Sequence, residues 1–146
     1  MKKISVLAML ALVLVLGLAF VGCSSGPDES PELTEIHVIK QADMDAGNYY
    51  NYATTIGASE GFFIRYVGKN PYADLTRFRI IEKRGATVIW DYEDAFTTNV
   101  PKGGNFMFNT GVYRIANAGT YTIEVYVVDA KGNKSNTKIV TLTVTG

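Results

Sequence analysis

From residue 33 onward, apolar and polar residues alternate with a period of two rather than the 3.6 of a helix. The segment TYTIEVYVVD at 120–129 shows this most clearly, and KIVTLTVT at 138–145 alternates in the same way, with threonines on its second face. This pattern is typical of antiparallel strands that bury one face and expose the other. The positions expected to face the core are Tyr121, Ile123, Val125, Val127, Val140, Leu142 and Val144, and those opposite them include Thr122, Glu124 and Tyr126.

The alternation predicts a series of short strands and no helix. The strands are expected at 33–39, 52–56, 61–68, 75–83, 87–92, 105–108, 120–129 and 138–145, with a further short one at 112–115. The turn-forming stretches KRGA, PKGGN and AKGNKSN separate several of them. Short strands at this spacing predict an all-β chain that folds as an antiparallel β-sandwich of about seven to nine strands.

The stretch NAGTYTIEVYVVDAKGNKS, residues 117–135, resembles the penultimate strand and final hairpin of bacterial immunoglobulin-like domains. The resemblance implies an immunoglobulin-like sandwich spanning residues 33–146. It also implies that Tyr121 is a tyrosine corner, with its ring in the core and its hydroxyl bonded to backbone near residues 115–118.

A second stretch, WDYEDA at 90–95, resembles the Trp-Asp-Phe-Gly-Asp-Gly motif of polycystic-kidney-disease (PKD) domains. Trp90, Asp91, the aromatic Tyr92 and Asp94 match that motif, whereas Glu93 and Ala95 replace its two glycines. The resemblance covers residues 88–146 and implies a structural role for Trp90. It leaves open whether the turn made by the two glycines is kept.

The N-terminus has the features of a secretory signal peptide. Lys2 and Lys3 precede an uncharged stretch at 4–22, which ends in FVGC with the only cysteine of the chain, Cys23. The ending resembles a bacterial lipobox, which implies cleavage before Cys23, a diacylglycerol thioether on its sulfur and an acyl chain, such as palmitate, on its new amino group. Two or more chains hold a protein stably on a membrane. The alternatives are an uncleaved helix and a catalytic cysteine, for which His37 is the only histidine available as a base.

This interpretation divides the chain into a signal peptide (1–22), a lipidated cysteine with a flexible tether (23–32) and the sandwich (33–146). Loss of the two lysines leaves 12 basic and 14 acidic residues, a net charge of −2. We therefore expect a lipid-anchored protein of the bacterial cell envelope, with other envelope proteins or glycans as partners and no nucleic acid. Arg77, Arg79 and Lys83 share one strand face, which we interpret as solvated rather than as a site for polyanions.

No motif typical of an enzyme occurs in the sequence, so the domain is expected to bind or to space rather than to catalyse. The leading hypothesis is protein–protein interaction or adhesion. The alternative is carbohydrate binding through the NYYNY stretch, by Tyr49, Tyr50 and Tyr52 with a contribution from Trp90, since these side chains combine flat apolar faces with polar groups. Against this, Tyr50 and Tyr52 share a strand face and are expected to pack inward, which would leave only Tyr49 outside.

Two groups of acidic residues could ligate calcium. Asp43 and Asp45 alternate in the stretch DMDAGN, and a second group comprises Asp91, Glu93, Asp94 and Asp129. An EF-hand loop would need an oxygen ligand and a glutamate where the chain has Gly47 and Thr54, so a polar turn without metal is the simpler interpretation. No other cofactor is expected. His37 lies between apolar positions of the first strand and is expected to face solvent.

Acylation of Cys23 is directly testable. Mass spectrometry of protein extracted from membranes should show a mature chain that starts at an acylated Cys23, and Cys23→Ser should release the domain or leave the precursor uncleaved. An unmodified Cys23 in a full-length, membrane-retained chain would contradict the lipobox interpretation.

Overall fold

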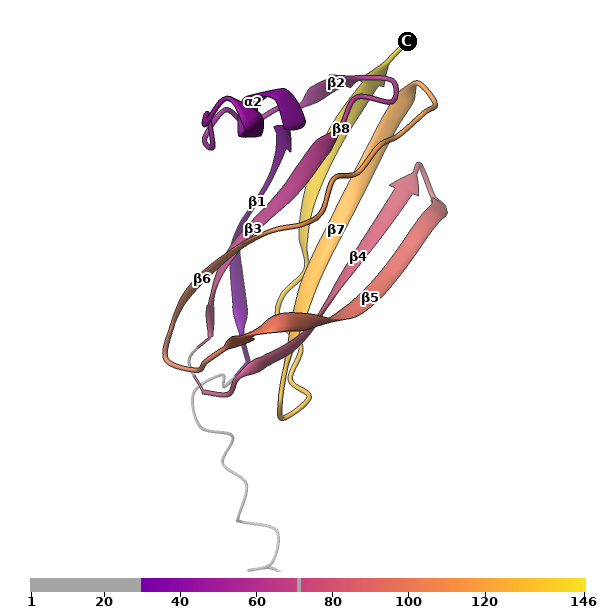
Figure 1. Ribbon diagram of the computed structural model, residues 1–146. Coiled ribbons are helices and arrows are strands. Elements are labelled where there is room, and N and C mark those ends of the chain that lie inside the picture. The colour runs from indigo at the N-terminus through magenta and orange to yellow at the C-terminus, as the bar shows by residue number, and fades with distance from the viewer. Residues whose placement is uncertain (1–29, 71) are drawn as a thin grey trace, which may run out of the picture.

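The computed structural model describes residues 30–70 and 72–146 (Figure 1). Cys23, the predicted signal peptide at 1–22 and most of the predicted tether lie outside the described residues. None of the helices in the described part is both long and apolar enough to cross a membrane.

The described residues form eight strands and one short helix. In chain order these are β1 (Glu32–Lys40), α2 (Gln41–Asp45), β2 (Thr55–Gly57), β3 (Phe62–Asn70), β4 (Leu75–Arg84), β5 (Thr87–Val100), β6 (Gly104–Asn109), β7 (Gly119–Asp129) and β8 (Lys138–Thr145).

These strands form two sheets that pack against each other (Figure 1). The smaller sheet has the order β1-β3-β6, and the larger has the order β2-β8-β7-β4-β5. All pairs are antiparallel except β2 with β8, which are parallel. The two orders correspond to the A-B-E and G-F-C strands of an immunoglobulin sandwich, with β5 as an added strand at the edge beside C. The predicted all-β, immunoglobulin-like sandwich is therefore confirmed.

The core lies between the sheets and is built by alternate residues, as the sequence pattern predicted. From β7 it receives Tyr121, Ile123, Val125 and Val127, and from β8 Leu142 and Val144. The smaller sheet contributes Leu33, Val38, Ile64 and Tyr66. Because strand side chains alternate between faces, the register that buries these residues also fixes which residues of β4 and β5 point outward.

Tyr121 makes the contact expected of a tyrosine corner. Its ring is buried in the core, and its hydroxyl donates a hydrogen bond to the carbonyl oxygen of Asn117 at 2.8 Å. That acceptor lies within the predicted stretch 115–118. Outside the core, the guanidinium of Arg84 lies 5.7 Å from the Tyr121 ring centroid and donates to the Ala118 carbonyl.

Several predicted boundaries were wrong. β5 continues to Val100 instead of ending at residue 92, and Gln41–Asp45 is helical although no helix was predicted. The stretch 112–115 contributes only an isolated bridge from Tyr113 to Phe62, and of 52–56 only Thr55 and Ile56 belong to a strand.

The expectation that the outer face of β7 is exposed to solvent is wrong at Tyr126. It points away from the core, yet only 9% of its surface is exposed. The Lys134 ammonium lies 3.7 Å from its ring centroid, and Arg79 donates to its hydroxyl at 3.1 Å. Two cationic groups, one over the ring and one at its hydroxyl, thus cover Tyr126 on the outer face.

Substitutions at Tyr121 and Tyr126 should separate the two faces of β7. Tyr121→Phe removes only a hydrogen bond and should lower the free energy of unfolding by about 1 kcal/mol. Tyr121→Ala also empties a ring-sized volume and should cost about 3–5 kcal/mol. Tyr126→Ala should cost less, about 1–2 kcal/mol, because flexible cations cover that ring. Denaturant unfolding measures all three, and equal losses for the two alanine variants would contradict the assigned faces.

Candidate functional site

The inner face of β5 is only partly covered, because the larger sheet extends beyond the smaller one. Tyr92 pairs with Ile80, a core residue, and Trp90 pairs with Glu82 two residues further along β4. Trp90 and Tyr92 therefore point to the same side as the core but stand at the edge strand. Trp90 packs against the core, whereas Tyr92 keeps 37% of its surface exposed.

The stretch 110–113 forms the opposite wall of a cleft beside these rings. Tyr113 is held by two backbone hydrogen bonds to Phe62, and the Thr110 hydroxyl accepts a hydrogen bond from the Ile64 amide at 3.0 Å. The resulting cavity has a volume of about 310 Å³. We call this cavity the aromatic cleft. It is lined by Phe78, Trp90, Tyr92, Thr110, Gly111, Val112 and Tyr113.

The rings of the aromatic cleft hold one another in place. Trp90 and Tyr92 are nearly parallel, with centroids 5.1 Å apart and planes 6° apart, and Tyr113 meets Trp90 edge-on at 5.2 Å. Phe78 lies 6.1 Å from Tyr92 and 5.4 Å from Phe96. These separations are typical of favourable aromatic pairs. The apolar surface of the cleft is therefore formed before any ligand binds.

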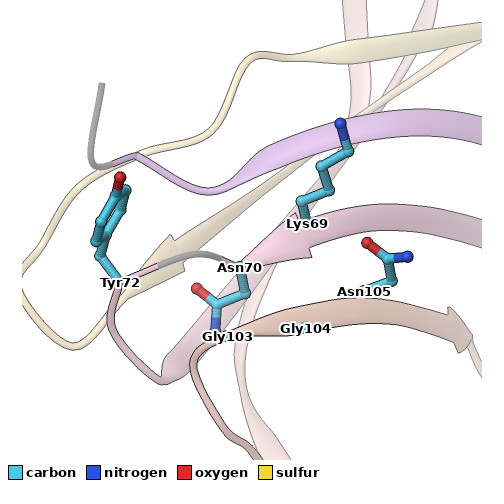
Figure 2. Close-up of a pocket in the computed structure, with 6 residues that line it drawn as sticks. All are labelled: Lys69, Asn70, Tyr72, Gly103, Gly104 and Asn105. Carbon is cyan, nitrogen blue, oxygen red and sulfur yellow. The ribbon is translucent and has the colours of Figure 1, made fainter. Parts of the chain in front are cut away.

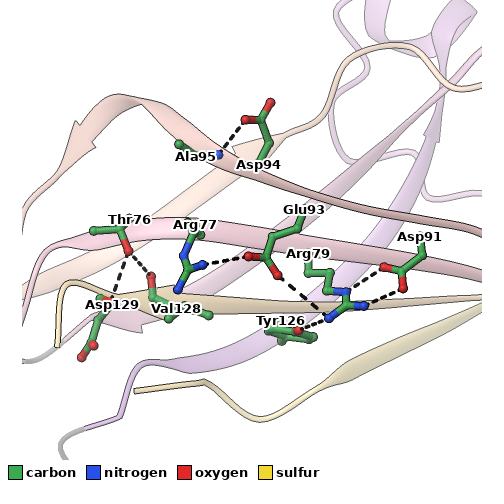
Figure 3. Close-up of polar contacts among 10 residues, drawn as sticks. All are labelled: Thr76, Arg77, Arg79, Asp91, Glu93, Asp94, Ala95, Tyr126, Val128 and Asp129. Carbon is green, nitrogen blue, oxygen red and sulfur yellow. Dashed lines mark hydrogen bonds and ion pairs between the residues drawn. The ribbon is translucent and has the colours of Figure 1, made fainter. Parts of the chain in front are cut away.

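Polar groups stand beside the rings. The Tyr92 hydroxyl donates a hydrogen bond to the Asp94 carboxylate. That carboxylate also accepts a bond of 2.8 Å from the Ala95 amide, which Figure 3 shows. The bond to Asp94 raises the pKa of Tyr92, and the same bond lowers the pKa of Asp94. Burial raises the pKa of Tyr113 to about 12. At neutral pH the cleft thus carries neutral phenol hydroxyls beside an ionised carboxylate.

The tyrosines of the NYYNY stretch lie elsewhere. Tyr49, Tyr50 and Tyr52 are 49%, 74% and 40% exposed, so the expectation that Tyr50 and Tyr52 pack inward is wrong. Tyr52 stacks on the His37 ring at 3.6 Å, and the Arg65 guanidinium lies 5.3 Å from the Tyr50 ring. Since His37 and Arg65 are register partners on β1 and β3, the two rings rest side by side on the outer face of the smaller sheet.

His37 is therefore less open than expected, since Tyr52 covers its ring. Its Nε2 atom also lies 3.0 Å from a Glu35 carboxylate oxygen. Arg65 is 2% exposed and donates to the carbonyl of Tyr49 and to the side chain of Asn109. These contacts hold the NYYNY stretch, residues 48–52, against the smaller sheet. Gly47 and the first four residues of the stretch line a shallow depression of their own.

The six acidic residues considered as calcium ligands are not brought together. Asp91 and Glu93 point outward from β5 toward arginines of β4, and Asp94 points to the other side, toward Tyr92. Asp129 accepts hydrogen bonds from backbone and side-chain groups of its own turn, at residues 131 and 133. Asp43 accepts from the Asn51 amide. Within the described part of the chain, no group of three or more histidines, cysteines or acids is placed to hold a metal ion.

Three basic residues of β4, Arg77, Arg79 and Lys83, are paired with acids on the outer face of the larger sheet; Figure 3 shows the pairs of Arg77 and Arg79. Arg79 forms two bonds of 2.6 and 2.7 Å to Asp91, which keep the pKa of Asp91 below its usual range. Arg77 pairs with Glu93 at 2.9 Å and Lys83 with Glu124 at 2.5 Å. The pairing balances the positive charges, as expected of a solvated strand face rather than a polyanion site.

Sequence reasoning identified Trp90 as part of a possible site but missed Tyr92, Phe78 and Tyr113. These residues come from three separate segments, so no local motif joins them. The spacing of Trp90 and Tyr92 was the available signal, because residues two apart in a strand share a face.

No protein-family model matches the chain, and no curated protein matches it. Among solved structures it is similar to Spo0M, a sporulation control protein from Bacillus subtilis, with a TM-score of 0.50 and 6% identity over 80% of this chain and 50% of that chain. The chain thus spans about half the length of Spo0M, and the similarity shows the fold alone.

Two further solved structures are more distant. A PKD domain of an M14-like peptidase from a Thermoplasmatales archaeon has a TM-score of 0.47 and 12% identity, over 81% of this chain and 99% of that chain. The PmoD soluble domain from a Methylocystis species has a TM-score of 0.41 and 17% identity, over 78% and 97%. At these scores the PKD assignment stays a resemblance in sequence.

Glu82 should make stability depend on pH. Burial raises its pKa above the value in the unfolded chain, so the ionised carboxylate destabilises the fold above the folded-state pKa. This cost should fall as the pH drops through that pKa. Glu82→Gln should therefore raise the free energy of unfolding at pH 7 and bring little change at pH 3.5, measured by denaturant unfolding.

Glu124→Gln is the matched control. It removes the partner of Lys83 on the outer face and should lower stability at pH 7 by at most about 1 kcal/mol. A loss of stability for Glu82→Gln similar to that of Glu124→Gln would contradict the assigned environment of Glu82.

Proposed function

We propose that this protein is a lipid-anchored protein of the bacterial cell envelope whose sandwich binds carbohydrate in the aromatic cleft. The anchor is supported by the FVGC sequence that ends the uncharged stretch at 4–22. β1 begins at Glu32, shortly after Cys23, and the intervening residues would reach about 30 Å when extended. A domain tethered in this way would stay close to the membrane and sample its surroundings.

The observation that carries the binding proposal is the pair of parallel rings, Trp90 and Tyr92, beside the Tyr92–Asp94 hydrogen bond. A sugar ring has apolar C–H faces and hydroxyl groups around its rim. Aromatic rings contact the C–H faces, and an ionised carboxylate accepts hydrogen bonds from the hydroxyl groups. A cavity of about 310 Å³ lies within the range of small-ligand sites, which are largely apolar with a few placed polar groups.

The polar groups favour binding over catalysis. A glycosidase needs a carboxyl with a raised pKa at the scissile bond to act as the acid. The bond from Tyr92 instead lowers the pKa of Asp94, which suits a hydrogen-bond acceptor. Neither carboxyl lines the cavity itself. Asp94 is connected to it by the Tyr92 hydroxyl, and Glu82, whose pKa is raised, is the register partner of Trp90. The proposal thus keeps the predicted binding role and names carbohydrate as the ligand. It assigns the carbohydrate site to the aromatic cleft instead of the NYYNY stretch.

The cleft contains the only tryptophan of the chain, so tryptophan fluorescence reports on this site alone. A glycan array should identify a carbohydrate that changes the fluorescence of Trp90 saturably. Tyr92→Ala should weaken its binding at least tenfold, about 1.4 kcal/mol, because it removes one stacking face and the hydroxyl.

Tyr50→Ala is the matched control, since it removes an exposed tyrosine on the outer face of the smaller sheet and should leave binding unchanged. Loss of binding in Tyr50→Ala with normal binding in Tyr92→Ala would place the site on the NYYNY stretch. Absence of any carbohydrate ligand would overturn the proposal.

A further inference from the structure

The polar groups next to the aromatic cleft carry negative charge. One is the Asp94 carboxylate, which is joined to the cleft by its bond from the Tyr92 hydroxyl. The other is the carboxylate of Glu82, the register partner of Trp90. Directly opposed residues of an antiparallel pair place their side chains on the same face of a sheet, so Glu82 and Trp90 both point to the core side.

Glu82 is the more unusual of these two acids. Its register partner on the other side is Ile123, a core residue, and burial raises the pKa of Glu82. The described part of the chain offers its carboxylate no hydrogen bond and no ion pair. A partly buried charge without a partner is unfavourable, because nothing in the protein offsets its loss of hydration.

Tyr113 connects Glu82 to the aromatic cleft. Burial is the main cause of its raised pKa, and the nearby Tyr92 and Glu82 add to the effect. The Tyr113 ring also meets Trp90 edge-on at 5.2 Å. The negative charge of Glu82 therefore acts on the end of the cleft that Trp90 and Tyr113 form.

The cationic side chains closest in sequence are engaged elsewhere. Lys83 is paired on the outer face of the larger sheet, and Arg84 donates to a backbone carbonyl. Arg114, which follows Tyr113, donates to one backbone and one side-chain oxygen of other segments. No lysine or arginine lines the cleft. A ligand is thus the remaining source of positive charge for Glu82.

The rings of the cleft are also free of cations, unlike other rings of the domain. Three tyrosines outside the cleft each contact a cation of the chain, namely Tyr50 with Arg65, Tyr121 with Arg84 and Tyr126 with Lys134. Among the described residues, no such cation lies over a ring that lines the cleft. Aromatic faces attract cations, and that of tryptophan does so most strongly. The cleft therefore favours a cationic ligand on two grounds.

A second cavity, where β3 ends and β6 begins, has the opposite charge (Figure 2). It is lined by Lys69, Asn70, Tyr72, Gly103, Gly104 and Asn105. The charged residue among them is a lysine, whose side chain is more than half exposed. A cationic ligand would meet a like charge there, so Tyr72 offers an exposed aromatic residue for comparison.

A sugar with a protonated amino group suits the aromatic cleft. Its C–H faces can contact the rings, while its ammonium group is attracted by the Glu82 carboxylate and by the face of Trp90. We propose that the carbohydrate bound in the aromatic cleft is an amino sugar with a free amine, whose ammonium group lies at the Trp90–Tyr113 end beside Glu82. This inference rests on the proposed function, because it names the class of sugar that the cleft takes.

Titrations of the full chain in detergent micelles, followed by the fluorescence of Trp90, test the proposal. The probes are a β-1,4-linked tetrasaccharide of glucosamine and its fully N-acetylated form, at a pH slightly below neutral where the free amines are protonated. The glucosamine form should bind at least tenfold more tightly, because it alone brings positive charge. Spermine, which has the charge but no sugar ring, should bind at least tenfold more weakly than the glucosamine form.

Glu82→Gln tests the role of the carboxylate. It keeps the shape of the side chain and removes an unfavourable charge, so the variant should fold. The preference for the glucosamine form over the acetylated form should fall at least threefold. Glu124→Gln is the matched control, since it removes the same charge from the outer face and should leave the preference unchanged. Tyr72→Ala should also leave binding unchanged.

The outcomes separate this inference from the proposed function. Equal binding of the two tetrasaccharides, or of spermine and the glucosamine form, would overturn the amino-sugar inference alone. An equal loss of preference in Glu82→Gln and Glu124→Gln would overturn it too, because net charge would then explain the preference. If neither tetrasaccharide nor any glycan of an array binds, the proposed function fails as well.

Discussion

The sandwich depends on the burial of alternate residues of β7. This strand is paired on both sides, with β4 and β8, and Tyr121, Ile123, Val125 and Val127 all enter the core. A slip of one residue would expose this entire set, so the register of β7 is strongly fixed. The register of β4 follows from it, and that of β5 follows from β4. Both surfaces of the larger sheet, the inner aromatic one and the outer charged one, therefore depend on the packing of β7.

The aromatic cleft exists because the two sheets differ in width. Three strands cannot cover five, so the inner face of β5 is covered only in part. Phe96 packs against Phe108 of β6, whereas Trp90 and Tyr92 face the stretch 110–113 across the cleft. The opposite face of β5 carries acids paired with arginines of β4. Charged residues on an edge strand also discourage pairing with another chain. The edge is thus suited to present rings on one side without becoming an aggregation surface.

The sequence was most informative where the contacts of a residue are set by alternation along its own strand or by a turn next to it. The faces of β7 and β8 and the Tyr121 hydrogen bond follow from alternation and from a local turn. It was least informative where a partner comes from far along the chain. Tyr50 and Tyr52 have the spacing of a strand face, yet Arg65 and His37 hold them on the surface. Tyr126 alternates correctly but is covered by Arg79 and Lys134. The burial of Asn70 gives no signal at all, because the carbonyls of Val100 and Pro101 that accept from its amide lie some thirty residues away.

The stretch WDYEDA shows how two substitutions can change what a motif builds. Glycine favours turns and weakens strands, so its replacement by Glu93 and Ala95 suits the uninterrupted β5 that the structure contains. In that strand Glu93 points outward and pairs with Arg77, while Tyr92 and Asp94 point inward and bond to each other. A turn at this place would take Asp94 out of line with Tyr92 and break the hydrogen bond between them. The departure from the PKD motif is therefore consistent with the cleft, since both depend on β5 staying extended through residues 93–95.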